Sequence, residues 1–118
     1  MTDRILCRLD DIDDPGARAF DIGDGRPEVV VFRVGEAVHA YRNDCPHLNI
    51  TLDFVPGRFM NLDATMIQCS NHGARFNIHD GRCVWGPCRG EWLERVAVRL
   101  EDGRVVLDEA AGTADNPD

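Results

Sequence analysis

The sequence predicts an all-β domain, built as an antiparallel β-sandwich or a partly open barrel. Three pairs of apolar segments, over residues 28–42, 76–84 and 95–107, are each joined by a short turn. Strands that recur this often along a chain are typical of sandwiches and barrels. No stretch repeats its apolar residues with the period of a helix, so these hairpins decide the fold class.

The chain before the first hairpin predicts one strand and one loop. Residues 5–9 have the pattern of a strand, in which Cys7 is expected to lie in the core. The acidic run over residues 10–14 is followed directly by proline and glycine, which is typical of a turn. Solvated charge is ordinary in such a loop, so the acidic run indicates no binding site.

Each hairpin has a turn signal of its own. The first joins strands over residues 28–34 and 37–42 through Gly-Glu at 35–36. The other two turn at Asp-Gly pairs, at 80–81 and 102–103, and Asp-Gly is among the strongest short signals for a hairpin. The three turns therefore predict three antiparallel strand pairs.

Two short clusters of cysteine and histidine carry the chemistry of the chain. Cys45 and His47 directly follow the first hairpin, and Cys69 and His72 come later in the chain. Two thiolates and two imidazoles can hold a tetrahedral zinc ion, or a [2Fe-2S] cluster in which two histidines replace two cysteines on one iron. By ligand type alone, both alternatives stay open.

The two clusters and the residues around them resemble the Rieske iron-sulfur family. The family pattern is Cys-x-His and, after an intervening stretch, Cys-x-x-His-Gly with an aromatic residue close behind. Cys45-Pro-His47 and Cys69-Ser-Asn-His72-Gly match both parts. A Gly-Pro pair at 86–87 stands where the family has a third loop that covers the cluster. Zinc motifs rarely supply all three parts, so the resemblance favours the iron-sulfur cluster.

The resemblance spans about residues 28–107 and implies a cofactor, its ligands and their place in the fold. It implies a Rieske-like fold in which the cluster-binding loops lie at one end of the β scaffold. One [2Fe-2S] cluster would be bound by Cys45, His47, Cys69 and His72. No residue is expected to be catalytic, since the sequence contains no Ser-His-Asp arrangement, phosphate loop or nucleophile elbow.

Ligand type and loop sequence together predict the soluble, low-potential type of Rieske protein. With two thiolates and two neutral imidazoles the oxidised cluster is neutral, so it accepts an electron more readily than a four-thiolate cluster. High-potential family members add a disulfide between the ligand loops and a serine hydroxyl aimed at the cluster. Leu48, Ser70 and Ala74 stand beside the ligands here, so neither feature can form, and we expect a potential of about −150 mV.

The segment between the two clusters, residues 48–68, is longer than the family's usual spacing and predicts an enlarged surface loop. Its apolar residues Phe54, Val55, Phe59 and Met60 could shield the cluster, contact a partner or form a small satellite core. The satellite core is the expected role, and the sequence leaves the other two open.

Three cysteines remain outside the two clusters, and an odd remainder fits a reducing compartment better than a disulfide framework. Cys83 and Cys88 flank the third loop. A local disulfide, or a thiol that tunes the cluster, is an alternative to two small packed side chains. His39 and His79 are expected to have structural or solvent-exposed roles. Trp85 and Trp92 could lie at the edge of the cluster or at the partner surface, and packing in the core is the expected role for both.

The net charge of −8 disfavours nucleic acid and anionic membranes as partners and suits docking to a basic patch on a reductase or oxygenase. No apolar run is long enough to cross a bilayer and the N-terminus lacks a signal-peptide profile, so we expect a cytoplasmic protein. One Rieske [2Fe-2S] domain is expected over residues 1–108, followed by a disordered acidic tail over 109–118.

These features predict an electron-transfer ferredoxin that carries single electrons from a flavin-dependent reductase to a terminal oxygenase or another redox enzyme, as the resemblance implies. One alternative is the small Rieske-like subunit of an assimilatory, nitrite-type reductase. A second alternative is a non-redox domain in which the two cysteines and two histidines hold structural zinc.

Overall fold

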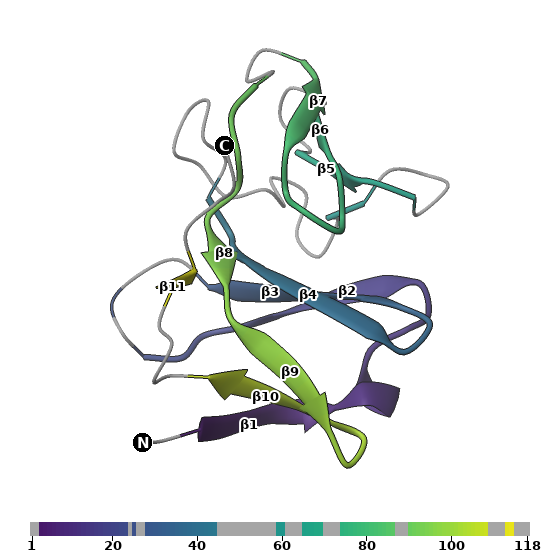
Figure 1. Ribbon diagram of the computed structural model, residues 1–118, viewed down its shortest axis with the longest axis vertical. Helices are drawn as coiled ribbons and strands as arrows, with labels where there is room; N and C mark the ends of the chain where they lie inside the picture. The colour runs from purple at the N-terminus through teal and green to yellow at the C-terminus, as the bar shows by residue number, and fades with distance from the viewer. Residues whose placement is uncertain are drawn as a thin grey trace.

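The prediction of an all-β fold is confirmed by the computed structural model, which forms three antiparallel sheets that do not close into a barrel (Figure 1). The model describes residues 3–23, 25, 28–44, 59–60, 65–69, 74–86, 90–108 and 113–114. Within these residues the helical structure is a single turn of 3-10 helix over Leu9–Asp11. No helix in the described part of the chain is long and apolar enough to cross a membrane.

The central sheet has the strand order β11-β8-β4-β3-β2. Its strands are β2 (Gly16–Phe20), β3 (Val29–Val34), β4 (Ala37–Arg42), β8 (Arg95–Val96) and β11 (Thr113–Ala114). The lower sheet has the order β1-β10-β9, with β1 (Asp3–Arg8), β9 (Val98–Glu101) and β10 (Arg104–Asp108). The small sheet has the order β5-β6-β7, with β5 (Ile67–Gln68), β6 (Arg75–Phe76) and β7 (Cys83–Trp85).

The sequence of β3 explains the layering of the sheets. Side chains alternate between the two faces of a strand, so Val29 and Val31 point to one face and Val30 and Phe32 to the other. All four side chains are fully buried, the first pair in a core shared with the lower sheet and the second pair in a core shared with the small sheet. The continuous apolar run therefore marks the strand of a middle layer, and Figure 1 shows the central sheet between the other two.

The core between the central and lower sheets includes Val105 and Leu107 of β10 and Ile12 from the loop after β1. Cys7 packs against this core but is only half-buried, at its margin. Burial, with the nearby charge of Asp11, raises the pKa of the Cys7 thiol. The prediction of a core position for Cys7 is therefore confirmed in part.

The core between the central and small sheets is closed by Phe59. This side chain is 4% exposed and its ring packs edge-on against Phe32, with the ring centroids 6.4 Å apart. Phe59 thus belongs to a main core of the molecule, which corrects the expectation that the segment 48–68 forms its own satellite core. Phe54 and Val55 lie outside the described residues.

All three predicted hairpins are present, as β3–β4, as β6–β7 and as β9–β10, the last with the predicted turn at Asp102-Gly103. In β6–β7 the predicted Asp-Gly pair lies within a longer connection over residues 77–82. The first strand of the third hairpin is divided at Ala97, because β8 pairs with β4 of the central sheet while β9 pairs with β10 of the lower sheet. The sequence analysis did not predict β2. Within the tail predicted to be disordered, Thr113–Ala114 pairs with β8, and the rest of residues 109–118 lies outside the described residues.

Candidate metal centre

The first ligand loop starts from a firmly held strand end. Asn43, directly after β4, is 1% exposed and its backbone N–H donates a 2.8 Å hydrogen bond to the carbonyl oxygen of Glu28. The Asp44 N–H donates to the carbonyl oxygen of Arg42 at 2.9 Å. The chain is therefore fixed up to the residue before the predicted ligand Cys45, which lies, like His47, outside the described residues.

The second ligand loop is the connection between β5 and β6. Cys69 follows β5 and is fully buried, and its backbone N–H donates a 2.8 Å hydrogen bond to the carbonyl oxygen of Ala74. The strand pair below it is in register, with Ile67 opposite Phe76. Residues 70–73, which include the predicted ligand His72 and lie outside the described residues, therefore connect two anchored positions.

The third loop approaches the second loop through a glycine. Gly86 has a φ of +105°, and a Cβ placed there would lie 2.8 Å from the Cα of Ala74. Only glycine adopts this backbone region without strain, and only glycine permits this approach. Because Ala74 also accepts the hydrogen bond from Cys69, the Gly-Pro loop is in contact with the base of the second ligand loop. This contact is consistent with a loop that covers a cluster.

Tyr41 joins the central sheet to the small sheet. Its hydroxyl donates a 2.7 Å hydrogen bond to the carbonyl oxygen of Ile78, and its ring lies against Gly81, where a Cβ would come within 2.6 Å of the ring. Burial of the ring raises the pKa of Tyr41 well above its usual range, so the hydroxyl stays a donor. The sequence analysis assigned no role to Tyr41, and only the tertiary contact reveals one.

The cysteine beside the third loop is packed. Cys83 is 1% exposed, and its Sγ lies 3.3 Å from the carbonyl oxygen of Trp85, to which the thiol donates a hydrogen bond. Cys88 lies outside the described residues, so a Cys83–Cys88 disulfide stays an alternative that the structure does not test.

The expectation that Trp85 packs in the core is wrong, since its side chain is 57% exposed on β7. The guanidinium of Arg75 lies over the indole ring, 5.4 Å from its centroid. Trp92 is half-buried, with the guanidinium of Arg82 5.8 Å from its ring. Simple alternation along β7 would place Trp85 on the same face as the buried Cys83, but a register shift in the pairing of β6 with β7 breaks the alternation, so no signal in the sequence could have placed Trp85 outside.

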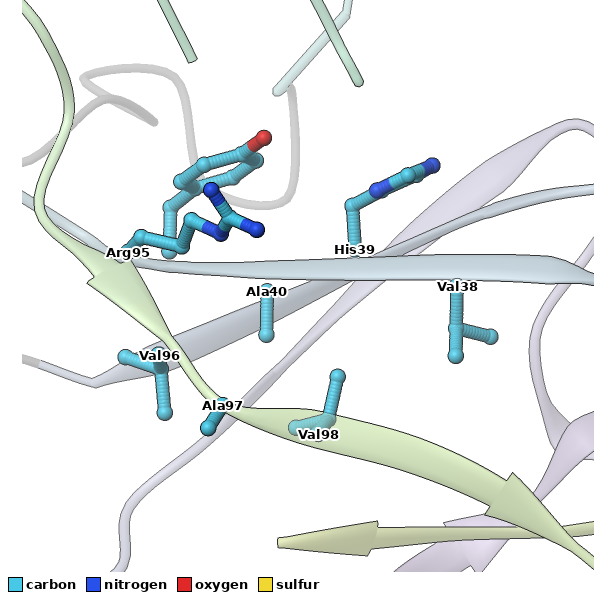
Figure 2. Close-up of a pocket in the computed structure, with 8 residues that line it drawn as sticks. Val38, His39, Ala40, Arg95, Val96, Ala97 and Val98 are labelled. Carbon is cyan, nitrogen blue, oxygen red and sulfur yellow. The ribbon is translucent and has the colours of Figure 1, made fainter. Parts of the chain in front are cut away.

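A separate cavity of about 210 Å³ lies between β4 and the chain over residues 95–98, where the chain passes from β8 of the central sheet to β9 of the lower sheet. Figure 2 shows His39 and Arg95 on one side of β4, and Val38 and Ala40 on the other. Burial lowers the pKa of His39, and the charges of His79 and Arg95 lower it further. The half-buried His39 therefore has a structural position, as expected.

The remaining histidine of the second hairpin is exposed. The side chain of His79 is 74% exposed, and its Nε2 lies 3.4 Å from an oxygen of the neighbouring Asp80 carboxylate. In the described part of the chain, no group of three or more His, Cys, Asp or Glu side chains could hold a metal ion. Of the four predicted ligands, the structure places Cys69 alone, at the closed end of the small sheet.

Cys69 thus lies buried at the end of a hairpin, and Gly86 of the third loop packs against the base of the loop that follows it. Loops positioned by a rigid scaffold often carry binding residues. A family model for the Rieske [2Fe-2S] domain matches residues 4–107. The chain therefore belongs to the Rieske [2Fe-2S] domain family and carries one [2Fe-2S] cluster. The family match sets aside the structural-zinc alternative.

Relatives of the chain include components of oxygenase systems. The ferredoxin component of the alkene monooxygenase system of Xanthobacter autotrophicus is 29% identical over 86% of this chain and 77% of its own length. The ferredoxin of carbazole 1,9a-dioxygenase from Nocardioides aromaticivorans IC177 is 27% identical, with a TM-score of 0.75 over 91% of this chain and 97% of its own. A chain of the complex between reduced oxygenase and oxidized ferredoxin of carbazole 1,9a-dioxygenase is 26% identical, with a TM-score of 0.73 over 89% and 91% of the two chains.

More distant structures share the fold alone. The terminal oxygenase of carbazole 1,9a-dioxygenase from Nocardioides aromaticivorans IC177 is 19% identical, with a TM-score of 0.74, and this chain matches 31% of its length. A structure named for the small subunit of a nitrite reductase is also 19% identical, with a TM-score of 0.69 over 92% of this chain and 99% of its own. Neither likeness assigns a function.

Proposed function

We propose that this protein is a Rieske ferredoxin that carries single electrons from a flavin-dependent reductase to a terminal oxygenase or another redox enzyme. The observation that carries the proposal is the match over almost the full length of the carbazole dioxygenase ferredoxin, at 27% identity. The ferredoxin component of the alkene monooxygenase system supports the same role. In the terminal oxygenase, by contrast, about two thirds of the chain has no counterpart in these residues.

The proposed ligands of the cluster are Cys45, His47, Cys69 and His72. The buried position of Cys69 supports this set, because a fully buried thiol at a loop base suits a metal ligand shielded from water. When bound, the cluster accepts and releases one electron at a time. The chain itself holds the ligand loops in place through the hydrogen bond from Cys69 to Ala74 and through the contact of Gly86 with Ala74. Firmly held ligands favour electron transfer, since little rearrangement accompanies each change of charge.

We place the protein in the cytoplasm and expect protein redox partners, with no nucleic acid and no membrane. The net charge of −8 disfavours polyanionic partners.

Spectra of protein purified without air test the cofactor. The visible and electron paramagnetic resonance spectra, recorded before and after dithionite, should show a red-brown protein whose reduced form has an average g of about 1.9. A redox titration should give a midpoint of about −150 mV, and a midpoint well above zero would contradict the low-potential type. A colourless protein that contains zinc would overturn the assignment of the cluster.

Reconstitution tests the electron-carrier role. A flavin-dependent reductase and a terminal oxygenase are combined with NADH, the oxygenase substrate and this protein. Product should form only when the protein is present, and the Cys69→Ala variant, which lacks a proposed ligand, is the matched negative control. Isolation of this protein as a subunit of a nitrite reductase would contradict the proposal of a separate electron carrier and favour the reductase-subunit alternative.

A further inference from the structure

An exposed aromatic side chain stands at the end of the molecule that carries the ligand loops. Trp85 is 57% exposed and its neighbour Val84 is 36% exposed, on the strand at the edge of the small sheet. An exposed tryptophan gains stability when a partner covers it, and tryptophan and arginine are the residues most often found at the energetic centre of protein interfaces. The position on a paired strand holds this side chain ready for a partner.

Two contacts tie Trp85 to the second ligand loop. Trp85 pairs with Arg75 across the small sheet, and Arg75 directly follows Ala74, which accepts the hydrogen bond from Cys69. On its other side Trp85 is followed by Gly86, which packs against Ala74. A partner that covers Trp85 therefore lies against the base of the loop that contains Cys69.

The side chain of Arg75 makes this site cationic. Its guanidinium lies over the indole ring of Trp85 at 5.4 Å from the ring centroid. A guanidinium stacked on an aromatic face presents its N–H donors at the edge of the stack, in the geometry that a carboxylate accepts. The stack also orders the two side chains before binding, which lowers the entropy cost of docking.

The distribution of charge along the chain favours the same end. In the described residues of the small sheet and of the segment that hydrogen-bonds to β7, Arg75 and Arg82 balance Asp80 and Glu91, a net charge of 0. The whole chain has a net charge of −8, so the acidic excess is carried by other residues. An acidic partner surface therefore meets less repulsion at the small sheet than the net charge of the chain implies.

We propose that Trp85, Arg75 and Val84 form the docking anchor for the protein redox partner, and that this partner presents an apolar recess bordered by carboxylates. This inference rests on the proposed function and names the surface chemistry of the partner. It revises the expectation from net charge alone that the partner docks through a basic patch. Repulsion between the rest of the acidic surface and the acidic partner then disfavours docking orientations in which the cluster lies far from the partner.

The test compares Trp85→Ala with Ile5→Ala in single-turnover electron transfer to the oxygenase of the reconstituted system. Ile5 is 56% exposed on β1 of the lower sheet and is a control matched in exposure but distant in the fold. Trp85→Ala should lower the second-order rate constant about tenfold, while Ile5→Ala leaves it unchanged. Trp85→Gln is a second variant, which removes the indole ring but keeps a longer, polar side chain on the strand, and it should lower the rate constant in the same way.

Two further comparisons sharpen the test: a pair of arginine variants, and a small-molecule oxidant in place of the protein partner. Arg75→Gln should lower the same rate constant several-fold and weaken its dependence on salt, while Arg104→Gln, on β10 of the lower sheet, should not. Oxidation of the reduced protein by hexacyanoferrate(III), which needs no recess, should be equally fast for Trp85→Ala and Ile5→Ala. The reduced electron paramagnetic resonance spectrum should also stay unchanged, which separates lost docking from a damaged cluster.

The outcomes separate the two proposals. If the wild-type protein supports product formation but Trp85→Ala matches Ile5→Ala, the docking anchor is overturned and the proposed function stands. If wild-type protein with an intact cluster delivers electrons to neither an oxygenase nor another redox enzyme, the proposed function fails and the anchor fails with it. If the wild-type protein sediments as a dimer that Trp85→Ala dissociates, the surface binds a second copy of this chain and the anchor is likewise overturned.

Discussion

The central sheet and the small sheet are held together in different ways. β3 and β4 pair over six residues, whereas β5 and β6 pair over two. A sheet of such short strands is not stable by itself and depends on what it packs against. The small sheet depends on the shared core, on Tyr41 and on the contact between Gly86 and Ala74. A cluster bound by the proposed ligands would add cross-links between the ligand loops. Removal of the cluster should therefore affect the small sheet far more than the rest of the molecule.

The largest effect is expected from Cys69→Ala. Loss of a proposed ligand should abolish the visible absorption of the cluster and reduce bound iron to less than about a tenth of the wild-type content. Hydrogen exchange should then be faster throughout β5–β7, while β3 and β10 keep their protection. Iron analysis and amide exchange by nuclear magnetic resonance measure the two effects.

The matched control is Cys7→Ala, which removes a half-buried thiol from β1 of the lower sheet. This variant should keep its iron and its spectrum. Full iron content in Cys69→Ala, or equal loss of protection in all three sheets, would contradict the comparison between the two sheets.

The next largest effect is expected from Gly86→Ala. The new Cβ would lie 2.8 Å from the Cα of Ala74 at a φ of +105°, so the third loop must move away. We expect a loss of about 3 kcal/mol in the free energy of unfolding, with faster release of iron. Gly103→Ala is the control, because its φ is +73° with no atom within 4 Å of the new Cβ, and about 1 kcal/mol is expected there. If chemical denaturation gave equal losses of unfolding free energy for Gly86→Ala and Gly103→Ala, the contact between Gly86 and Ala74 would not contribute to stability.

The sequence predicts the local hairpins of this fold better than it predicts which strands pair within each sheet. Turn residues and apolar runs predicted the β3–β4, β6–β7 and β9–β10 hairpins, since these signals are local. The division of the first strand of the third hairpin at Ala97 was missed because the choice between two sheets depends on tertiary packing. β2 was missed because Gly16–Phe20 contains no strong turn or apolar signal of its own.

The candidate site shows the same limit. The spacing of the cysteines and histidines predicted the ligand set, and the buried position of Cys69 agrees with it. The closing hydrogen bond from Cys69 to Ala74 and the role of Tyr41 depend on atoms brought together by folding. The exposure of Trp85 was missed because a large aromatic residue is buried by default, and here a stacked arginine covers one face of the ring.

A smaller effect is expected from Tyr41→Phe, which removes the hydrogen bond between the two sheets. The carbonyl oxygen of Ile78 loses its 2.7 Å partner in a buried site, so the free energy of unfolding should fall by about 1–2 kcal/mol. The effect should depend on pH, because burial raises the pKa of Tyr41 in the folded state. Above about pH 10 the unfolded chain releases this proton and the folded chain does not, so the wild-type protein loses stability there.

Denaturation at neutral and alkaline pH measures both parts of this prediction. The gap between the wild-type protein and Tyr41→Phe should narrow as the pH rises above about 10. A gap that stays constant would show that Tyr41 ionises equally easily in both states, which contradicts its burial.

The smallest effect is expected from His39→Gln, in the cavity beside β4. Burial first, and then the charges of His79 and Arg95, lower the pKa of His39 in the folded state. As the pH falls below about 6.5, the unfolded chain binds a proton at this position before the folded chain does, so the wild-type protein loses stability on acidification. His39→Gln should lose less stability between about pH 7.5 and about pH 5.5 than the wild-type protein, by chemical denaturation at each pH. His79→Gln should keep most of the wild-type pH dependence of stability, because burial is the larger cause of the lowered pKa of His39. If His79→Gln removed this pH dependence completely, the charge of His79 would be its cause.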